Sequence, residues 1–352
     1  MEKVHYRKFT RDEFDAGVWG QMRRVALDQN GQVIGIHHAD DTNKWADGSD
    51  VDWTAYENNV WNCMVQIPKF YYRIMRGDHI GYDTYRCEIS NIPESGYKLH
   101  PAFEREDGVI ENYQYMSAFE GWIDAAGRLR SLPNKKPADS KTIAEFRACA
   151  KRNGDHFTQQ DFYLLSAIQM LYLVEYGGFN ARKLLAQGVV IASASMTGLS
   201  LDLGNKSSGA SKTFMSYRGI ENLYGNYFKF IDGINTDYVT VYLAKNNFVS
   251  DKFSENYKKV GVLPKIPGYI KKFHNLSDEF DFAFIPSEVG ASENSHVSDY
   301  IYSPNYPQSK YVVFSGGRRN HEYSNGLFSL NVTMSASESG IYYSARLQCI
   351  KG

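Results

Sequence analysis

The stretch S-Y-R-G-I-E-N-L-Y-G-N-Y-F-K-F-I-D-G-I-N, residues 216–235, combines a dense set of apolar and aromatic side chains with turn-forming residues. Gly219, Gly225 and Gly233 supply positions where a positive φ costs little. From Tyr224 onward apolar and polar residues alternate, which is the pattern of a half-buried strand. The stretch holds no nucleophile–base pair and no metal-ligand spacing. We therefore predict a compact turn followed by a core strand, with a structural role.

Strand patterns continue on the N-terminal side of this stretch. Asn30-Gly31 separates two β-like runs and is a strong two-residue hairpin signal. Residues 60–74 form a strand-rich aromatic run, which Pro68 places at an edge, a bulge or a strand junction. Between them lies a polar stretch, residues 39–59, which follows His37 and His38. The spacing of these histidines and the aspartates after them matches no metal-ligand pattern, so a solvated surface loop is predicted at 39–59.

Two helices are predicted. Residues 142–154 have apolar residues at helical spacing, basic residues in the last turn and Gly154 just past the end. Residues 161–177 present a broad apolar face, and Thr158 with Asp161 has the form of a capping start. Two helices beside a mostly β chain indicate an α+β domain.

Composition limits the function. The 352 residues are 43% hydrophobic and 22% charged, with a formal net charge of -1. This balance argues against a general electrostatic footprint for nucleic acid or an anionic membrane, and no apolar run is long enough to span one. The aromatic content is high, at 14%, with 26 tyrosines. Tyrosine suits recognition surfaces as well as β cores.

Cysteine usage and the N-terminus indicate a protein assembled in a reducing cytoplasm. The four cysteines form no C-x-x-C pair and are too few for a disulfide scaffold, so buried thiols are predicted at Cys63, Cys87, Cys149 and Cys349. The N-terminus lacks the apolar region of a signal peptide. We expect export by lysis inside a particle rather than by secretion.

Four segments resemble one known family. R-G-I-E-N-L-Y-G-N-Y-F-K-F-I-D-G (218–233), V-Q-I-P-K-F-Y-Y-R-I (65–74), H-P-A-F (100–103) and Y-M-S-A-F-E-G (115–121) are similar to segments of phage tail and receptor-binding proteins, including variable proteins of diversity-generating retroelements. The resemblance implies a C-type-lectin-like fold, related to that of formylglycine-generating enzymes. That fold has twisted antiparallel sheets, two flanking helices and long loops.

The resemblance also sets the expected domain division. Residues 1–19, which have no clear period, are expected to form an attachment or oligomerisation segment. Residues 20–352 would form the lectin-like ligand-binding domain, with 295–352 as its ligand-display region. Neither the sugar-lectin calcium motifs nor the C-terminal cysteine pair of formylglycine-generating enzymes is present, so no cofactor or metal is expected.

The C-terminal residues have the composition of a binding surface. Short apolar anchors alternate with Tyr, Ser, Asn and Arg, which supply contact area, adaptable hydrogen bonds and hot spots. Gly316-Gly317, Gly326-Leu327-Phe328 and Arg346 resemble landmarks of the family's variable region, although Arg319 stands where the family often has Trp. The resemblance implies ligand contacts by Arg318, Arg319, Asn320, His321, Glu322, Tyr323, Asn325, Tyr342 and Tyr343.

These observations predict a non-enzymatic adhesin at the tip of a phage tail, with the bacterial cell surface as the alternative location. Its partners would be a bacterial surface receptor, protein or glycan, and other tail proteins bound through the N-terminus. A homo-oligomer such as a trimer is expected. Two alternatives stay open: a polysaccharide hydrolase using Asp278, Glu279 or Asp281, and a structural tail or baseplate component.

Overall fold

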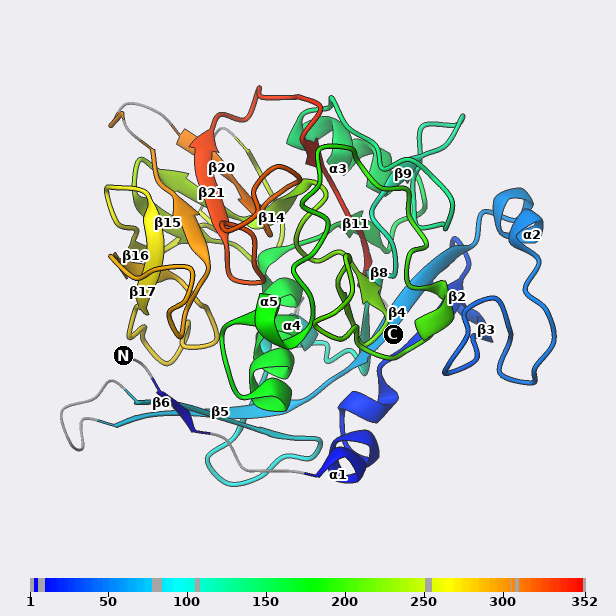
Figure 1. Ribbon diagram of the computed structural model, residues 1–352, viewed down its shortest axis with the longest axis horizontal. Coiled ribbons are helices and arrows are strands. Elements are labelled where there is room, and N and C mark those ends of the chain that lie inside the picture. The colour runs from blue at the N-terminus through cyan, green and yellow to red at the C-terminus, as the bar shows by residue number, and fades with distance from the viewer. Residues whose placement is uncertain are drawn as a thin grey trace.

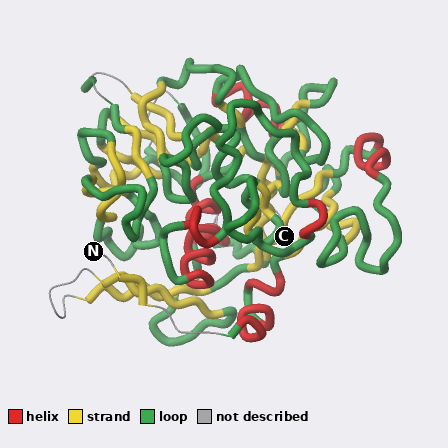
Figure 2. Tube along the Cα trace, in the orientation of Figure 1, coloured by secondary structure: helices red, strands yellow, loops and turns green. Residues whose placement is uncertain are grey.

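The computed structural model describes residues 3–5, 10–77, 84–104, 108–250, 255–304, 306–307 and 310–350. Within these ranges sheets dominate and helices are few, which confirms the predicted α+β class (Figure 1). Loops and turns carry much of the chain between the strands (Figure 2).

The largest sheet has nine strands and contains most of the C-terminal half. Its order is β16-β15-β14-β20-β21-β19-β17-β18, with β22 paired to β14. Most neighbours are antiparallel, whereas β14–β22 and β19–β21 are parallel. The strands are β14 Phe228–Asp237, β15 Thr240–Leu243, β16 Lys258–Val262, β17 Gly268–Phe273, β18 Pro286–Val289, β19 Tyr300–Tyr302, β20 Lys310–Ser315, β21 Leu330–Met334 and β22 Tyr343–Ser344.

A six-stranded antiparallel sheet joins the N-terminal strands to the end of the chain, in the order β11-β23-β8-β4-β2-β3. Asn30-Gly31 makes the predicted turn between β2 and β3, with Gly31 at φ 72. Pro68 ends β4 at the junction with β5, also as predicted. The strands are β2 Arg23–Leu27, β3 Val33–Ile36, β4 Asn62–Pro68, β8 Tyr113–Ser117, β11 Phe157–Gln159 and β23 Leu347–Cys349.

Smaller elements complete the described chain. A four-stranded sheet, order β1-β6-β5-β7, runs along the lower edge in Figure 1. It comprises β1 Lys3–His5, β5 Tyr71–Gly77, β6 Thr84–Ser90 and β7 Lys98–Leu99. Two short hairpins are separate from it: β9 Trp122–Ile123 pairs with β10 Leu129–Arg130, and β12 Ser216–Tyr217 pairs with β13 Ile220–Glu221. The helices are α1 Arg11–Ala16, α2 Trp53–Asn58, α3 Ile143–Lys151, α4 Phe162–Tyr176 and α5 Ala181–Leu184.

Strand β14 lies between two hydrophobic cores. Ile231 and Ile234 belong to the larger core, and Phe228 and Phe230 belong to the second. All but the last of its ten residues are buried. The core strand predicted from the sequence is confirmed, but the half-buried pattern was wrong, because both faces of β14 are covered.

The turn before β14 has the backbone that its residues favour. Asn222 and Asn226 have φ values of 50 and 58, and asparagine tolerates this left-handed region better than most residues. Gly225 has φ 79, and a Cβ there would lie 2.7 Å from the Val189 nitrogen. The turn therefore needs glycine at 225 for both conformation and close approach.

A buried ion pair joins two of the family-like motifs. Lys229 Nζ lies 3.0 Å from Glu120 Oε1, and both side chains are fully buried. The other Glu120 oxygen accepts a hydrogen bond of 2.6 Å from the Asn226 amide. Arg346 donates to the carbonyls of Glu221 and Ser117 at 2.7 and 2.6 Å. The C-terminal strand is thus fixed to both motifs by charged hydrogen bonds, which are stronger than neutral ones.

Both predicted helices form. Thr142 and Glu145 make a capping box before α3. Helix α4 begins after Asp161, whose side chain accepts from the Leu164 amide at 2.9 Å, while Thr158 belongs to β11, so the Thr158–Asp161 capping start was wrong. Helix α4 is buried on every side rather than on one face, as expected of a central helix that is apolar all round.

Residues 39–59 are not wholly a solvated loop. They include α2, and Tyr56 is fully buried. His37 just before them is 2% exposed, with Nδ1 2.8 Å from the Thr42 carbonyl and Nε2 2.6 Å from the Tyr56 hydroxyl. The sequence missed this because the buried aromatic residues are spaced between aspartates. All four cysteines are buried thiols, as predicted.

His37 should make stability depend on pH. Burial lowers the pKa of His37 from 6.5 to about 4, although the hydrogen bond to the Thr42 carbonyl opposes this shift. Between these values the unfolded chain binds more protons, so stability is lost as pH falls from 6.5 to 4, by about 3 kcal/mol from this group. Urea unfolding of His37→Gln and the parent protein at pH 7 and pH 4.5 should show a shallower decline in the variant. Parallel declines would contradict this assignment.

Candidate ligand-binding surface

The C-terminal segment is built on buried anchors, as predicted. Val312–Phe314, Leu327, Phe328, Leu330, Val332 and Leu347 are at most 2% exposed. Ile341 is an exception, because it is 56% exposed in the loop before β22. Since the other anchors sit in β20, β21 and β23 or beside them, the intervening residues are held on a rigid scaffold (Figure 1).

A double-glycine turn directs the chain out of β20. Gly316 and Gly317 have φ values of 87 and 73. A Cβ on Gly316 would lie 2.4 Å from the Leu223 carbonyl, and one on Gly317 would lie 2.0 Å from Asn325 Oδ1. This double-glycine turn brings residues 318–326 against the turn before β14, where the Arg319 amide donates to the Asn226 carbonyl at 3.0 Å.

Two of the predicted ligand contacts lie in the interior. Asn325 is fully buried under the Gly316–Gly317 turn. Arg319 is 7% exposed, and its guanidinium donates to the Ile341 carbonyl at 2.7 Å. It also lies 4.6 Å from the ring centres of both Tyr227 and Tyr342. The prediction that these two side chains are presented to solvent was therefore wrong; they support the surface.

The other predicted residues reach solvent to different degrees. Asn320, Glu322 and Tyr323 are exposed, Tyr323 by 51%. Arg318, His321, Tyr342 and Tyr343 are half-buried. We call these seven residues the display surface. Its Arg318 guanidinium lies 3.8 Å from the Tyr342 ring centre, a cation–π contact that orders both side chains.

His321 is held as a neutral ring. Its Nδ1 is 2.8 Å from the Tyr302 hydroxyl, which also lies 2.7 Å from Ser324 Oγ. Burial, and after it the Arg318 charge, lower the His321 pKa to about 4. Tyr302 was missed as a site residue, although the Tyr-Ile-Tyr alternation of β19 places Tyr300 and Tyr302 on one face. Tyr300 packs against both Tyr302 and Tyr269, so aromatic rings continue beyond the display surface.

The three candidate hydrolase carboxylates lie in different surroundings. Asp281 accepts from the Tyr72 hydroxyl at 2.6 Å and pairs with Lys98 at 2.7 Å. Glu279 pairs with Lys258 at 2.5 Å and is 55% exposed. Asp281 and Glu279 thus pair with different lysines, Asp281 near the interior and Glu279 in solvent. The third, Asp278, is exposed in the turn before them.

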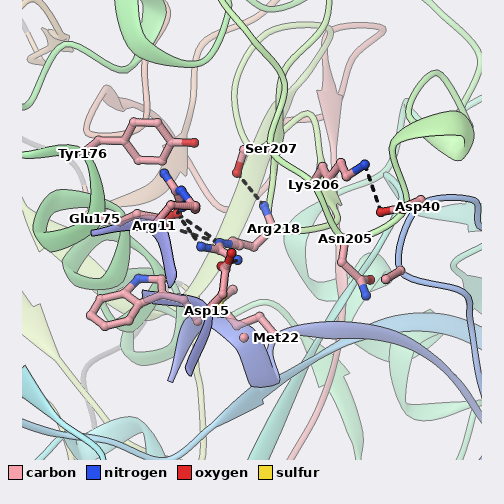
Figure 3. A pocket seen from close by; sticks show the side chains of 13 residues that line it. Arg11, Asp15, Met22, Asp40, Glu175, Tyr176, Asn205, Lys206, Ser207 and Arg218 are labelled. Carbon is pink, nitrogen blue, oxygen red and sulfur yellow. Dashed lines mark hydrogen bonds and ion pairs between the residues drawn. The ribbon is translucent and has the colours of Figure 1, made fainter. Parts of the chain in front are cut away.

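A separate pocket of about 580 Å³ lies between the N-terminal helix and α4 (Figure 3). Glu175, whose side chain is fully buried, binds Arg218 through Nη2 at 2.6 Å and also binds Arg11. Arg218 in turn donates to Asp15 of α1 at 2.8 Å. These ion pairs attach α1 to the body of the protein, so the charged groups that line this pocket have structural partners.

Glu175→Gln should loosen the N-terminal helix. Removing one partner of a buried ion pair leaves the other charge uncompensated, so we expect a loss of about 3 kcal/mol in the free energy of unfolding. Limited proteolysis should show new cleavage within residues 10–21. Asp15→Asn is the control, because Asp15 is 47% exposed and such pairs contribute under about 1 kcal/mol. Equal effects of the two substitutions would contradict the assignment.

The N-terminal segment predicted to attach the protein is only partly described. Residues 1–2 and 6–9 lie outside the described residues. Phe14, Val18 and Trp19 are buried in the larger core. An attachment role therefore stays a prediction and would fall on residues before α1.

The described ranges contain no group of three or more His, Cys, Asp or Glu side chains suited to hold a metal ion. Nor does any helix within them combine the length and apolar character needed to cross a bilayer.

No protein-family model and no curated protein matches the sequence. Among solved structures, the P3c variant of a Major Tropism Determinant superposes with a TM-score of 0.36 at 10% identity, and the I1 variant with 0.35 at 9%. Each match covers 80% of this chain and 72% of the other. These neighbours are variable phage tail proteins with a C-type-lectin-like fold. They are the kind of protein that the sequence motifs resemble.

Proposed function

We propose that this protein is a non-enzymatic receptor-binding protein of a phage tail or similar particle. It would have a C-type-lectin-like fold and bind a bacterial surface ligand through the display surface. The observation that carries the proposal is the arrangement of Arg318, His321, Tyr323 and Tyr342 beside β20, β21 and β23, whose apolar anchors are almost completely buried.

The physical support is preorganisation. Binding costs less when side chains are already ordered, and tyrosine and arginine offer contact area and hot spots. Tyr342 is ordered by Arg318, and His321 is ordered by Tyr302. Asn320, Glu322 and Tyr323 remain at the surface for hydrogen bonds. A polar aromatic surface of this kind binds modestly at one site, so several copies in a homo-oligomer such as a trimer would supply avidity.

Alanine substitution tests the proposal. The variant carries alanine at Arg318, Asn320, Tyr323 and Tyr342, and labelled protein is incubated with a panel of bacterial strains. The control carries alanine at Lys44, Asp50, Asn58 and Asn59 around α2, which lies at the opposite side of the molecule from β20 and β21 (Figure 1). Urea unfolding establishes that both variants remain folded.

We expect the parent and the control to bind at least one strain, and the display variant to lose at least about tenfold in affinity, or 1.4 kcal/mol. Equal binding by all three proteins would move the site elsewhere. Absence of binding by the parent, together with capture of the display surface by another particle protein, would favour a structural tail component instead.

A further inference from the structure

Two neighbouring pockets open beside α3, and no display surface residue is among the described residues that line them. One of about 650 Å³ lies between α3, residues 248–250 and the serine-rich residues 335–337. The other, of about 210 Å³, lies between α3 and residues 245–248. Arg147 and Phe248 line both. The two pockets therefore meet at these side chains and form one site, which we call the α3 site.

Cations dominate the accessible wall of the α3 site. Lys151 and Lys245 line the smaller pocket and Lys310 lines the larger one, and all three residues are exposed. Lys151 donates to the Asp155 carbonyl at 3.3 Å and forms no ion pair with a described carboxylate. Asp161 is the one carboxylate among the described residues that line the two pockets, and it is fully buried, as is Asp232 behind Arg147 at 1% exposed. The exposed charged side chains among these lining residues are therefore all lysines.

Arg147 is the fixed element of the α3 site. Its Nε and Nη2 bind the Asp232 carboxylate at 3.0 and 2.5 Å, and Nη2 also donates to Ser250 Oγ at 3.0 Å. These contacts hold the guanidinium plane and leave Nη1 without a partner among the described residues. A guanidinium held in this way is preorganised to donate to an oxyanion.

We propose that the α3 site binds the anionic group of a surface saccharide, either a carboxylate or a phosphate. Arg147 Nη1 would donate to the oxyanion, with Lys151 and Lys245 adding charge. The Phe248 ring offers an apolar face to the sugar, and Ser335 and Ser337 supply hydroxyls for its polar groups. Because residues 335–337 belong to the region predicted to display the ligand, the α3 site would bind one charged sugar of the same receptor. This biological setting rests on the proposed receptor-binding function, while the anion chemistry does not.

Three related sugars test the chemistry by isothermal titration calorimetry: glucuronate, glucose 6-phosphate and glucose. They share a ring and differ in the anionic group. We expect at least one of the two acids to bind at least tenfold more tightly than glucose, and added NaCl to weaken that binding. Binding by glucuronate alone would identify a carboxylate as the preferred anion, binding by glucose 6-phosphate alone a phosphate, and binding by both would show that the site accepts either. Equal titrations for all three sugars, including no binding by any, would overturn the proposal.

A charge-reversal variant locates the binding. Lys151→Glu with Lys245→Glu should reduce acid binding at least tenfold, while Lys265→Glu, at an exposed lysine between β16 and β17, should leave it unchanged. These exposed positions avoid the buried Asp232 contact that substitution of Arg147 would disturb. Equal acid affinity in the two variants would overturn the assignment to the α3 site.

Cell binding separates this proposal from the one on which its setting rests. Acid binding by a protein that attaches to no strain would keep the α3 site and remove the receptor-binding function. Attachment to cells by a protein that binds neither acid would keep the function and remove the α3 site.

Discussion

Lys229→Met is expected to lower the free energy of unfolding by about 3 to 5 kcal/mol. Burial lowers the pKa of Lys229 to about 8, although the nearby Glu120 opposes this shift, so the lysine remains charged at pH 7. The substitution would leave the Glu120 carboxylate fully buried, and the amides of Asn222 and Asn226 would be its remaining donors among the described residues. Urea unfolding at pH 7 measures the loss.

The double variant Lys229→Met with Glu120→Gln is the matched control. Removing both charges replaces a buried ion pair by a neutral pair, which is often close to neutral in stability. We expect the double variant to recover at least half of the loss, since the introduced glutamine amide oxygen can still accept from Asn226. A double variant that is as unstable as Lys229→Met would show that the lysine acts through packing alone.

Arg319→Ala is expected to reduce both stability and cell binding, although its side chain is almost inaccessible. Loss of charged hydrogen bonds to the carbonyls of Asn226 and Ile341 and of the contacts with Tyr227 and Tyr342 should cost about 2 to 4 kcal/mol. Because Arg319 joins the 318–326 loop to the loop before β22, both halves of the display surface would lose their support.

Arg318→Ala provides the contrast. Arg318 is half-buried, and among the described residues its guanidinium donates to the neighbouring Arg319 carbonyl at 3.2 Å. Its loss should reduce cell binding while changing the free energy of unfolding by under about 1 kcal/mol. Urea unfolding and cell binding of the two variants, measured side by side, check this division. If Arg318→Ala destabilised the protein as much as Arg319→Ala, a contact role for Arg318 would be contradicted.

Local patterns predicted the elements that depend on nearby residues. Asn30-Gly31 marks its hairpin, and the apolar spacing within residues 142–154 and 161–177 predicts α3 and α4. Each of these signals acts within a few residues, so the sequence carries it completely. The apolar anchors of β20 and β21 were found for the same reason.

The features that could not be predicted from the sequence depend on contacts between segments that are far apart in the chain. Nothing local distinguishes Arg319 from Arg318, and only the close approach of residue 226 makes one structural and the other accessible. Asn325 is buried because Gly317 lacks a side chain. Likewise, Arg147 and Lys245 meet in the α3 site through folding, since almost a hundred residues separate them in the chain.

Site-specific photo-crosslinking would show whether the display surface touches the bacterial ligand. A photoreactive amino acid replaces Tyr323, which is 51% exposed, and a second protein carries it at Asn58 of α2. Both are irradiated on a strain that the parent protein binds. We predict a covalent adduct with a cell-envelope component at position 323 and none at position 58. An adduct at position 58 alone, or at neither position while both proteins remain bound, would contradict the assignment of the ligand to the display surface.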